Sequence, residues 1–219
     1  MEIIRETIIN KSVEDCWEVL GEQYTEIHRW SSAVNHAEGD GKTGLNGASC
    51  DIRGCNLEGV GEIAEKLVEF DPTNHQLAYQ VIKGMPKMIK SAQNSWKLTP
   101  LSDTRTKVYM KAQIAPNGFL ASLMAPMMKM KFGKMLAETV EELKYFVERG
   151  QPHPRKVKAS KKFAAKSPQF SQQTFVWGAI LIAAMLLQSC KIADLRTASI
   201  DKSSEKREAK AIQLLEEVI

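Results

Sequence analysis

Residues 117–149, NGFLASLMAPMMKMKFGKMLAETVEELKYFVER, are the stretch that decides the fold. Apolar residues recur in it at the spacing of a helix with one buried face. The members of that face are Met128, Phe132, Met135, Thr139, Leu143 and Phe146. Pro126 suits a first turn, because its missing N–H has no helical partner there. Gly150 and Pro152 supply a stop. The sequence therefore predicts one long helix near the end of a domain.

The first half of this helix is rich in methionine. Met124, Met127, Met128, Met130 and Met135 fall within twelve residues. Methionine is flexible and fills irregular space, so a methionine-rich helix face can border a ligand cavity. Ordinary core packing is the alternative, and the helix by itself does not decide between the two.

The residues before the helix predict an antiparallel sheet. Glu2–Asn10 alternates as a strand should, and Ser12 then caps a short helix, SVEDCWEVL, which is followed by a helical turn at Tyr24–His28. Six further strands are expected, separated by Gly-, Pro-, Asn- and Asp-containing turns. Their expected ranges are Val34–Glu38, Ala48–Arg53, Glu58–Phe70, Gln76–Ile82, Ala92–Thr99 and Lys107–Ile114.

Alternation in the last two strands assigns one face of the sheet to the core. Ala92, Asn94, Trp96 and Leu98 share one side of their strand, and the other side is polar. Val108, Met110, Ala112 and Ile114 do the same in the next strand. The expected fold class is α+β, a curved antiparallel sheet of about seven strands wrapped round the long C-terminal helix. Because a curved sheet cannot touch a straight helix along its whole length, a gap that can hold a ligand is expected between them.

Charge and cysteine content exclude several classes of protein. Residues 1–150 carry 18 Lys+Arg and 20 Asp+Glu, whereas residues 151–169 carry 6 basic and no acidic residues. The basic excess thus belongs to a linker, and we expect no nucleic-acid binding by the domain. Cys50 and Cys55 have no second Cys or His pair to complete a zinc site, so neither a metal nor a cofactor is expected. The N-terminus lacks the pattern of a signal peptide, which favours a cytoplasmic domain with free thiols.

The chain resembles the START-like, helix-grip superfamily, also called SRPBCC, and within it the polyketide cyclase/dehydratase-like group. The matching segments are INKSVEDCWEVLGEQYTEIHRW, GASCDIRG, GVGEIAEKLVEFD, LAYQVIKGMP, NSWKLTP and FGKMLAETVEELKYFVERG, which together span about residues 2–154. The resemblance implies a helix-grip fold that binds a hydrophobic small molecule, such as a lipid or polyketide, for transport, sensing or presentation. It also allows a cyclase or dehydratase acting on an aromatic or polyketide substrate. It supplies no catalytic residue.

Candidate ligand-binding residues follow from the inward face, the long helix and the expected mouth of the cavity. Asn94 is the most informative, because a buried amide must find hydrogen-bond partners and a ligand could be one; a strand-edge Asn bonded to backbone near a turn is the alternative. His28 and His36 are candidates for acid–base chemistry, although solvated loop histidines are the simpler interpretation. No nucleophile or phosphate-loop motif occurs, so an enzyme here would orient a reactive substrate. The predicted ligand-binding set is Trp30, His36, Tyr79, Asn94, Trp96, Met110, Met124, Met128 and Phe132.

The rest of the chain predicts an appendage to a domain at residues 1–154. Residues 155–172 are expected to form a basic flexible linker. Residues 173–190 contain the apolar run Phe175–Leu187, FVWGAILIAAMLL, and are expected to form an apolar helix that is a candidate membrane anchor. The apolar run is short for a bilayer core, which needs about 20 apolar residues. Docking on a partner or on the domain itself is the alternative. Residues 191–219 form a charged, partly helical tail. A tethered protein-interaction module is a third, weaker interpretation of the whole chain.

Overall fold

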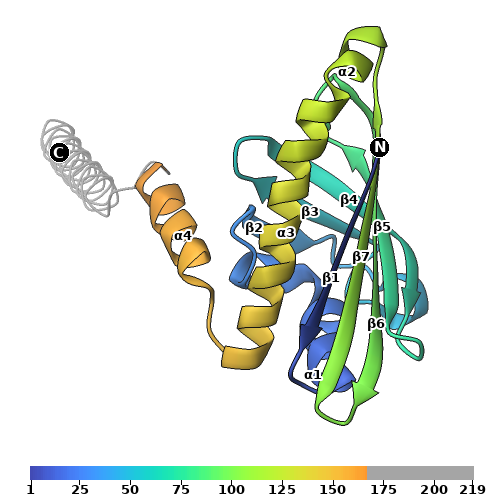
Figure 1. The fold of residues 1–219 in the computed structure, drawn as a ribbon, viewed down its shortest axis with the longest axis vertical. Helices are drawn as coiled ribbons and strands as arrows, with labels where there is room; N and C mark the ends of the chain where they lie inside the picture. Colours follow the sequence, from blue (N-terminus) through green and yellow to red (C-terminus); the bar gives the residue numbers. More distant parts are fainter. Residues whose placement is uncertain (167–219) are drawn as a thin grey trace, which may run out of the picture. The chain divides into compact units, whose positions relative to one another are not determined.

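The computed structural model describes residues 1–166, which contain a seven-stranded antiparallel sheet with a long helix lying across it (Figure 1). The strand order is β1-β7-β6-β5-β4-β3-β2, so the first strand pairs with the last. The α+β class and the helix-grip arrangement predicted from the sequence are confirmed. The strands are β1 (Glu2–Ile9), β2 (Val34–Gly39), β3 (Ile52–Leu57), β4 (Gly61–Asp71), β5 (Gln76–Lys83), β6 (Ile89–Ser102) and β7 (Arg105–Pro116).

The inward face predicted from alternation is the face that the helix covers. In the β6–β7 register Asn94 lies opposite Ala112, Trp96 opposite Met110 and Leu98 opposite Val108. All six side chains are buried. The core therefore sits between this face and the long helix, as expected for a sheet with one wetted side.

Two strand starts differ from the prediction because glycine-containing turns occupy the expected positions. The strand predicted at Ala48–Arg53 begins only at Ile52, since residues 45–47 form a short 3-10 turn in which Asn46 has φ 49°. The Asn46 side chain donates from Nδ2 to the Phe70 carbonyl at 2.7 Å, which stabilises that left-handed conformation. β4 begins at Gly61, because Gly59 and Gly61 have φ of 77° and 100° in the turn before it.

Both short helices predicted after the first strand are present. α1 (Val13–Trp17) begins after Ser12, whose Oγ accepts from the Asp15 N–H at 3.1 Å. A π-helical segment, η1 (Glu18–Glu22), and a 3-10 helix, η2 (Tyr24–Arg29), follow. Another 3-10 turn, η3 (Leu45–Gly47), precedes β3. A side chain at Gly21 would collide with the Trp17 ring, so the tight passage from α1 to η2 requires glycine there.

The helix predicted over residues 117–149 is present but divided at Met124. α2 (Phe119–Leu123) and α3 (Ala125–Arg149) meet there, because Pro126 has no N–H to continue the hydrogen-bond ladder. α3 ends at Gly150, which has φ 68° and donates its N–H to the Phe146 carbonyl at 2.8 Å. The predicted glycine stop is therefore confirmed.

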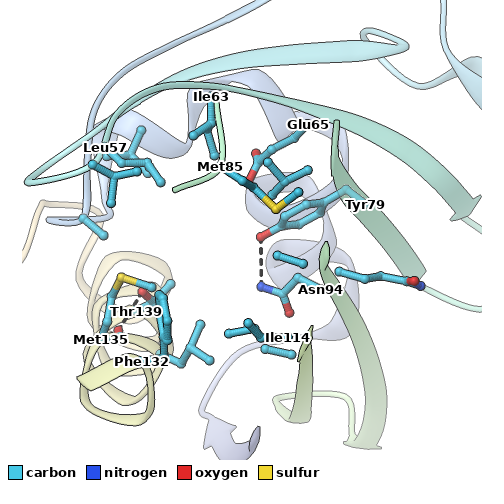
Figure 2. Close-up of a pocket in the computed structure, with 18 of the residues that line it drawn as sticks. Leu57, Ile63, Glu65, Tyr79, Met85, Asn94, Ile114, Phe132, Met135 and Thr139 are labelled. Atoms are coloured by element: carbon cyan, nitrogen blue, oxygen red, sulfur yellow. Dashed lines mark hydrogen bonds between the residues drawn. The ribbon is translucent and has the colours of Figure 1, made fainter. Parts of the chain in front are cut away.

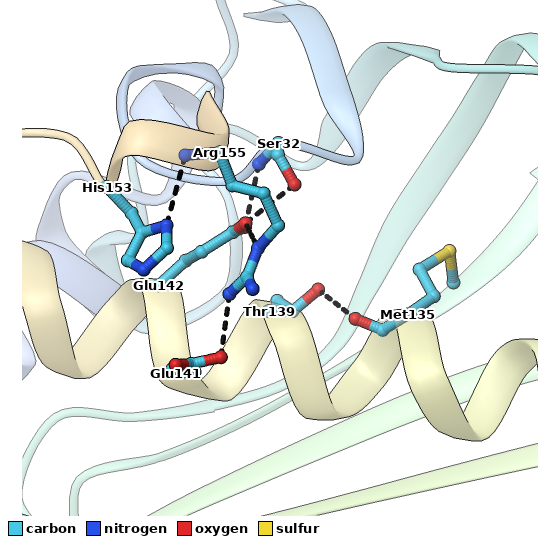
Figure 3. A network of polar contacts seen from close by, with 7 residues as sticks. All are labelled: Ser32, Met135, Thr139, Glu141, Glu142, His153 and Arg155. Atoms are coloured by element: carbon cyan, nitrogen blue, oxygen red, sulfur yellow. Dashed lines mark hydrogen bonds and ion pairs between the residues drawn. The ribbon is translucent and has the colours of Figure 1, made fainter. Parts of the chain in front are cut away.

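Residues 154–166 form a helix, α4 (Pro154–Lys166), which differs from the flexible linker predicted from residue 155. Its first turn is held by the ion pairs of Arg155 (Figure 3) and by a buried lysine, Lys156. Arg155 bonds from Nε to Glu142 and from Nη2 to Glu141, each at 2.7 Å. Lys156 is buried and donates from Nζ to the Val34 carbonyl at 2.7 Å. Composition indicated solvated lysines, but tertiary partners order this segment.

Within residues 1–166, no helix is long and apolar enough to cross a membrane. The predicted apolar helix at residues 173–190, with Phe175–Leu187, lies outside the described residues. The end of the predicted linker and the charged tail at residues 191–219 lie outside them too.

Candidate ligand-binding cavity

A cavity of about 160 Å³ lies between α3 and the inward face of the sheet (Figure 2). Its walls come from η2 and the loop after it, from the strands β2 to β7 and from α3. The lining is mainly apolar, as a site for a small apolar molecule requires. The apolar lining residues are Ile27, Ala33, Val34, Leu57, Val60, Ile63, Val81, Met85, Pro86, Ile89, Ala92, Met110, Ala112, Ile114, Phe132, Met135 and Leu136.

Asn94 and Tyr79 form a buried polar pair in the cavity wall (Figure 2). They are cross-strand neighbours on β6 and β5, and Asn94 Nδ2 donates to the Tyr79 hydroxyl at 2.9 Å. Burial raises the pKa of Tyr79 well above its ordinary value, so the hydroxyl keeps its proton. Within the described chain, the buried Oδ1 of Asn94 has no hydrogen-bond partner. A buried acceptor without a partner is unusual, and an ordered water or a polar group of a ligand can satisfy it.

A buried ion pair forms the next part of the wall. Arg53 on β3 faces Glu65 on β4 in the strand register and donates to its Oε2 from Nε at 2.9 Å and from Nη2 at 2.6 Å. Nη1 donates to the Tyr24 carbonyl at 2.6 Å, and the guanidinium lies 3.7 Å from the Tyr24 ring centroid. Burial opposes the charge on Arg53, but Tyr24 and Glu65 outweigh it and hold the pKa well above its ordinary value. The pair is therefore a fixed dipole beside the apolar space.

Cys55 completes this cluster without becoming reactive. Its thiol donates to Glu65 Oε2 at 3.4 Å, and burial raises its pKa to about 12. Cys16, Cys50 and Cys55 are all free and buried. A thiol that stays protonated is a poor nucleophile, so the structure gives Cys55 a packing role.

Ser31 supplies a second orphaned polar atom on the lining. Its hydroxyl is buried and has no hydrogen-bond partner within residues 1–166. Thr139 on α3 also lines the cavity, but its hydroxyl donates to the Met135 carbonyl at 2.9 Å (Figure 3). The lining therefore offers unsatisfied hydrogen-bonding groups at Asn94 and Ser31 in otherwise apolar surroundings.

Four of the nine predicted binding residues line this cavity: Tyr79, Asn94, Met110 and Phe132. Trp30 and Trp96 are buried in the core and line a separate gap of about 10 Å³. On this measure a space of about 10–15 Å³ holds a single water, so the gap is too small for a ligand and the two indole rings pack in the core.

The two candidate histidines lie outside the cavity lining. The His36 side chain is 59% exposed and its Nε2 lies 3.7 Å from a Glu38 carboxylate oxygen. The His28 ring lies 5.6 Å from the His36 ring, and burial lowers the pKa of His28. This geometry gives neither ring contact with a molecule in the cavity.

The methionines of the long helix separate into three groups. Met135 lines the cavity, whereas Met128 is buried in the core and Met124 is half-buried at the joint between α2 and α3. Met127 and Met130 are exposed on the opposite side of the helix. Met124 and Met128 therefore do not contribute to the lining.

Sequence reasoning missed Arg53, Glu65 and Ser31. A signal for the ion pair is present, because Arg53 alternates with Cys55 on β3, while Glu65 alternates with Ile63 and Leu67 on β4. Charged residues at inward positions of two adjacent strands indicate a buried pair. Ser31 lies in a loop, and no periodicity marks it.

The fold and the apolar cavity under the long helix α3 define a helix-grip, START-like protein. Residues 1–148 match the family described as "Polyketide cyclase / dehydrase and lipid transport". The chain belongs to this polyketide cyclase/dehydrase and lipid transport family.

Solved structures share the fold at low sequence identity. The protein XoxI from Bacillus cereus is 12% identical, with a TM-score of 0.55 over 69% of this chain and 99% of its own. The Zhui aromatase/cyclase from Streptomyces sp. R1128 is 11% identical, with a TM-score of 0.55 over 70% of this chain and 99% of its own. A conserved protein from Geobacillus kaustophilus is 13% identical, with a TM-score of 0.52 over 67% and 95%. No curated protein matches the sequence. At these identities the likeness concerns the fold.

Proposed function

We propose that this domain binds a small, mainly apolar molecule and holds a polar group of that molecule against Asn94 and Tyr79. The observation that carries the proposal is the buried Asn94 Oδ1, which has no partner among residues 1–166 and lies in an apolar cavity. A ligand hydroxyl or N–H donating to that oxygen would satisfy it, and Ser31 offers a further contact. Family membership supports the same class of ligand. The binding would serve transport, sensing or presentation.

The cavity volume limits the size of the ligand. An apolar cavity of roughly 150 Å³ holds one benzene ring, and this cavity measures about 160 Å³. The part of a ligand held inside the cavity in this conformation is therefore about one ring in size. A polyketide of several fused rings or a long acyl chain would have to extend out of the open side of the cavity, or move α3 or the β5–β6 connection outward.

A cyclase or dehydratase acting on an aromatic or polyketide substrate is the second candidate. Two polar side chains, Tyr79 and Asn94, converge in the cavity as that hypothesis requires. However, Tyr79 holds its proton and Glu65 is engaged by Arg53 and Cys55. These residues can orient a substrate carbonyl, but they offer no ready general base, so binding is the better supported function.

The direct test is a titration of the ¹⁵N-labelled full chain with phenol and with benzene, followed by NMR. Phenol should bind saturably and shift the side-chain amide signal of Asn94, because its hydroxyl can donate to Oδ1. Benzene should bind in the same place and leave that signal closer to its free position. Absence of saturable shifts around the cavity with either compound would contradict the proposal.

Filling the cavity should abolish this binding without unfolding the domain. Ala92 is half-buried and lines the cavity, so Ala92→Leu places its added carbons in the empty space. We expect phenol affinity to fall by roughly tenfold or more, while the thermal midpoint stays the same or rises. Ala115→Leu is the matched control, because Ala115 is also half-buried on a strand but does not line the cavity. Equal loss of binding in both variants would argue against the cavity as the site.

Asn94→Leu should separate polar from apolar recognition. The variant removes the orphaned oxygen together with the Nδ2 donor to Tyr79, and keeps the branching and number of heavy atoms of the side chain. Phenol binding should weaken by roughly five- to tenfold, because a hydrogen bond contributes about 1–1.5 kcal/mol. Benzene binding should be unchanged or tighter. Calorimetric titration measures both, and a parallel loss for the two compounds would show that Asn94 acts only through packing.

A further inference from the structure

An apolar stripe lies exposed on α2 and the first turns of α3. Its members are Phe119 (86% exposed), Leu120 (69%), Leu123 (69%), Met127 (42%) and Met130 (70%). Single exposed apolar side chains are common, but a contiguous group signals an interaction surface. We call these five residues the α2–α3 stripe.

The stripe follows one side of a nearly continuous helical path. Met124 ends α2 by donating its N–H to the Leu120 carbonyl and starts α3 by accepting from the Met128 N–H, each at 3.1 Å, and its own backbone is helical, with φ −82° and ψ −4°. Positions 120, 123, 127, 130 and 134 therefore share a side. The buried positions Ala121, Met128 and Leu136 fall on the opposite side, against the sheet. The stripe is thus not part of the domain core.

Lysines border the stripe on two elements. Lys129, Lys131 and Lys134 are exposed on α3. Lys87, Met88 and Lys90 are exposed around the start of β6. Residue Asn117 fixes this connection beside the start of α2, because its N–H donates to the Met88 carbonyl at 2.8 Å and its Nδ2 to the Lys87 carbonyl at 2.9 Å.

The sequence around the stripe contains very little negative charge. Residues 72–102 and 104–137 include no Asp or Glu. Glu2, at the start of β1, borders this end of β7 and accepts from Gln113 at 3.4 Å. The surface therefore combines exposed Leu, Met and Phe side chains with five lysines, a combination that is complementary to an anionic lipid bilayer.

We propose that the α2–α3 stripe docks this domain on an anionic bilayer. Phe119, Leu120 and Leu123 would enter the acyl region, while the lysine ammonium groups remain at the level of the lipid phosphates. A second copy of the chain fits poorly, because a two-fold contact would set lysines against lysines. Nucleic acid would satisfy the lysines but not the exposed apolar side chains.

The stripe also adjoins the cavity wall. Met85, Pro86 and Ile89 line the cavity, and the exposed Lys87 and Met88 lie between them in sequence. Docking through the stripe therefore brings this wall of the cavity toward the lipid, where apolar molecules are concentrated. Docking itself does not depend on the cavity being occupied, so it can be tested apart from the proposed function.

A residue-specific fluorescent label tests the proposal in the full chain. The variant Leu123→Cys is made in a Cys190→Ala background and labelled with the environment-sensitive dye NBD. The dye should react at position 123 alone, because the three thiols of the described domain are buried. Leu101→Cys is the matched control, because Leu101 is 50% exposed next to the β6–β7 turn. Vesicles of phosphatidylcholine with phosphatidylserine should shift the emission of the label at position 123 to the blue, with no shift at position 101.

Charge reversal provides the second arm. Lys131→Glu with Lys134→Glu should weaken the vesicle response at position 123 by roughly tenfold or more, because each lysine near an anionic surface contributes about fivefold to binding. Three results would overturn the proposal. In the first, the emission of the label at position 123 stays that of a dye in water although the chain sediments with the vesicles. In the second, vesicles of pure phosphatidylcholine give the same blue shift as anionic vesicles. In the third, the blue shift occurs without vesicles and grows with protein concentration. The last result would indicate self-association.

Discussion

Replacing Glu65 with leucine is expected to lower the free energy of unfolding by about 3–5 kcal/mol, the cost of leaving a buried charge without its partner. The Arg53 side chain is 2% exposed, and two of its hydrogen bonds go to Glu65 Oε2. After the substitution, the guanidinium keeps only the Tyr24 carbonyl and the aromatic rings as favourable contacts. Urea denaturation of the full chain measures the loss as a lower midpoint with a similar slope.

The double variant Arg53→Met with Glu65→Leu is the control for this prediction. Removing both charges replaces the pair by apolar side chains of similar volume, which is often neutral or stabilising in other proteins. The double variant should therefore be more stable than Glu65→Leu alone, with a coupling energy of about 2 kcal/mol or more. The single variant Arg53→Met completes the comparison. If the loss of unfolding free energy in the double variant equals the sum of the losses in Arg53→Met and Glu65→Leu, the two residues do not act as a pair.

Glu142→Leu is expected to detach α4 and to cost about 2–4 kcal/mol. The Glu142 side chain is fully buried, and its carboxylate accepts from the Ser32 N–H at 2.8 Å, the Ser32 hydroxyl at 2.6 Å and Arg155 Nε at 2.7 Å (Figure 3). Hydrogen bonds to a charged group contribute more than neutral ones, and the variant leaves the Ser32 donors without a partner. Amide exchange in residues 154–166 should become faster in this variant.

The matched control is Glu141→Gln on the same helix. Glu141 also bonds Arg155 at 2.7 Å, but its side chain is 60% exposed. Exposed ion pairs contribute little because water screens them, so the unfolding free energy should change by less than about 1 kcal/mol. If Glu141→Gln and Glu142→Leu have equal effects, burial is not what makes the Glu142 contact strong.

Local patterns predicted the elements well where one physical signal dominated. Alternation in β6 and β7 identified Asn94, Trp96 and Met110 as inward residues, because period two follows directly from strand geometry. Helical spacing placed Phe132 and Met135 on the buried side of α3. The same spacing could not separate Met128, which packs in the core, from Met135, which reaches the cavity. That distinction depends on where the sheet curves away from the helix.

Composition and sequence proximity did not predict the surroundings of polar side chains near element ends. The lysine-rich start of α4 suggested a solvated linker, yet Lys156 is buried against the Val34 carbonyl and Arg155 reaches Glu142. His36, chosen because it lies near Trp30 in sequence, is exposed instead. Side chains of loops and element ends carry no periodicity, so their direction cannot be read from spacing.

By itself, the sequence determined the strand–helix order, the inward face of the sheet and the glycine at the end of α3, because hydrogen-bond geometry and side-chain periodicity are local properties of the chain. Tertiary structure decided the size of the cavity, the pairing of Arg53 with Glu65 and the orphaned oxygen of Asn94. The cavity and the oxygen depend on the gap that sheet curvature leaves beneath a straight helix, and the ion pair depends on the register of β3 against β4; both are set by contacts between residues apart in the chain.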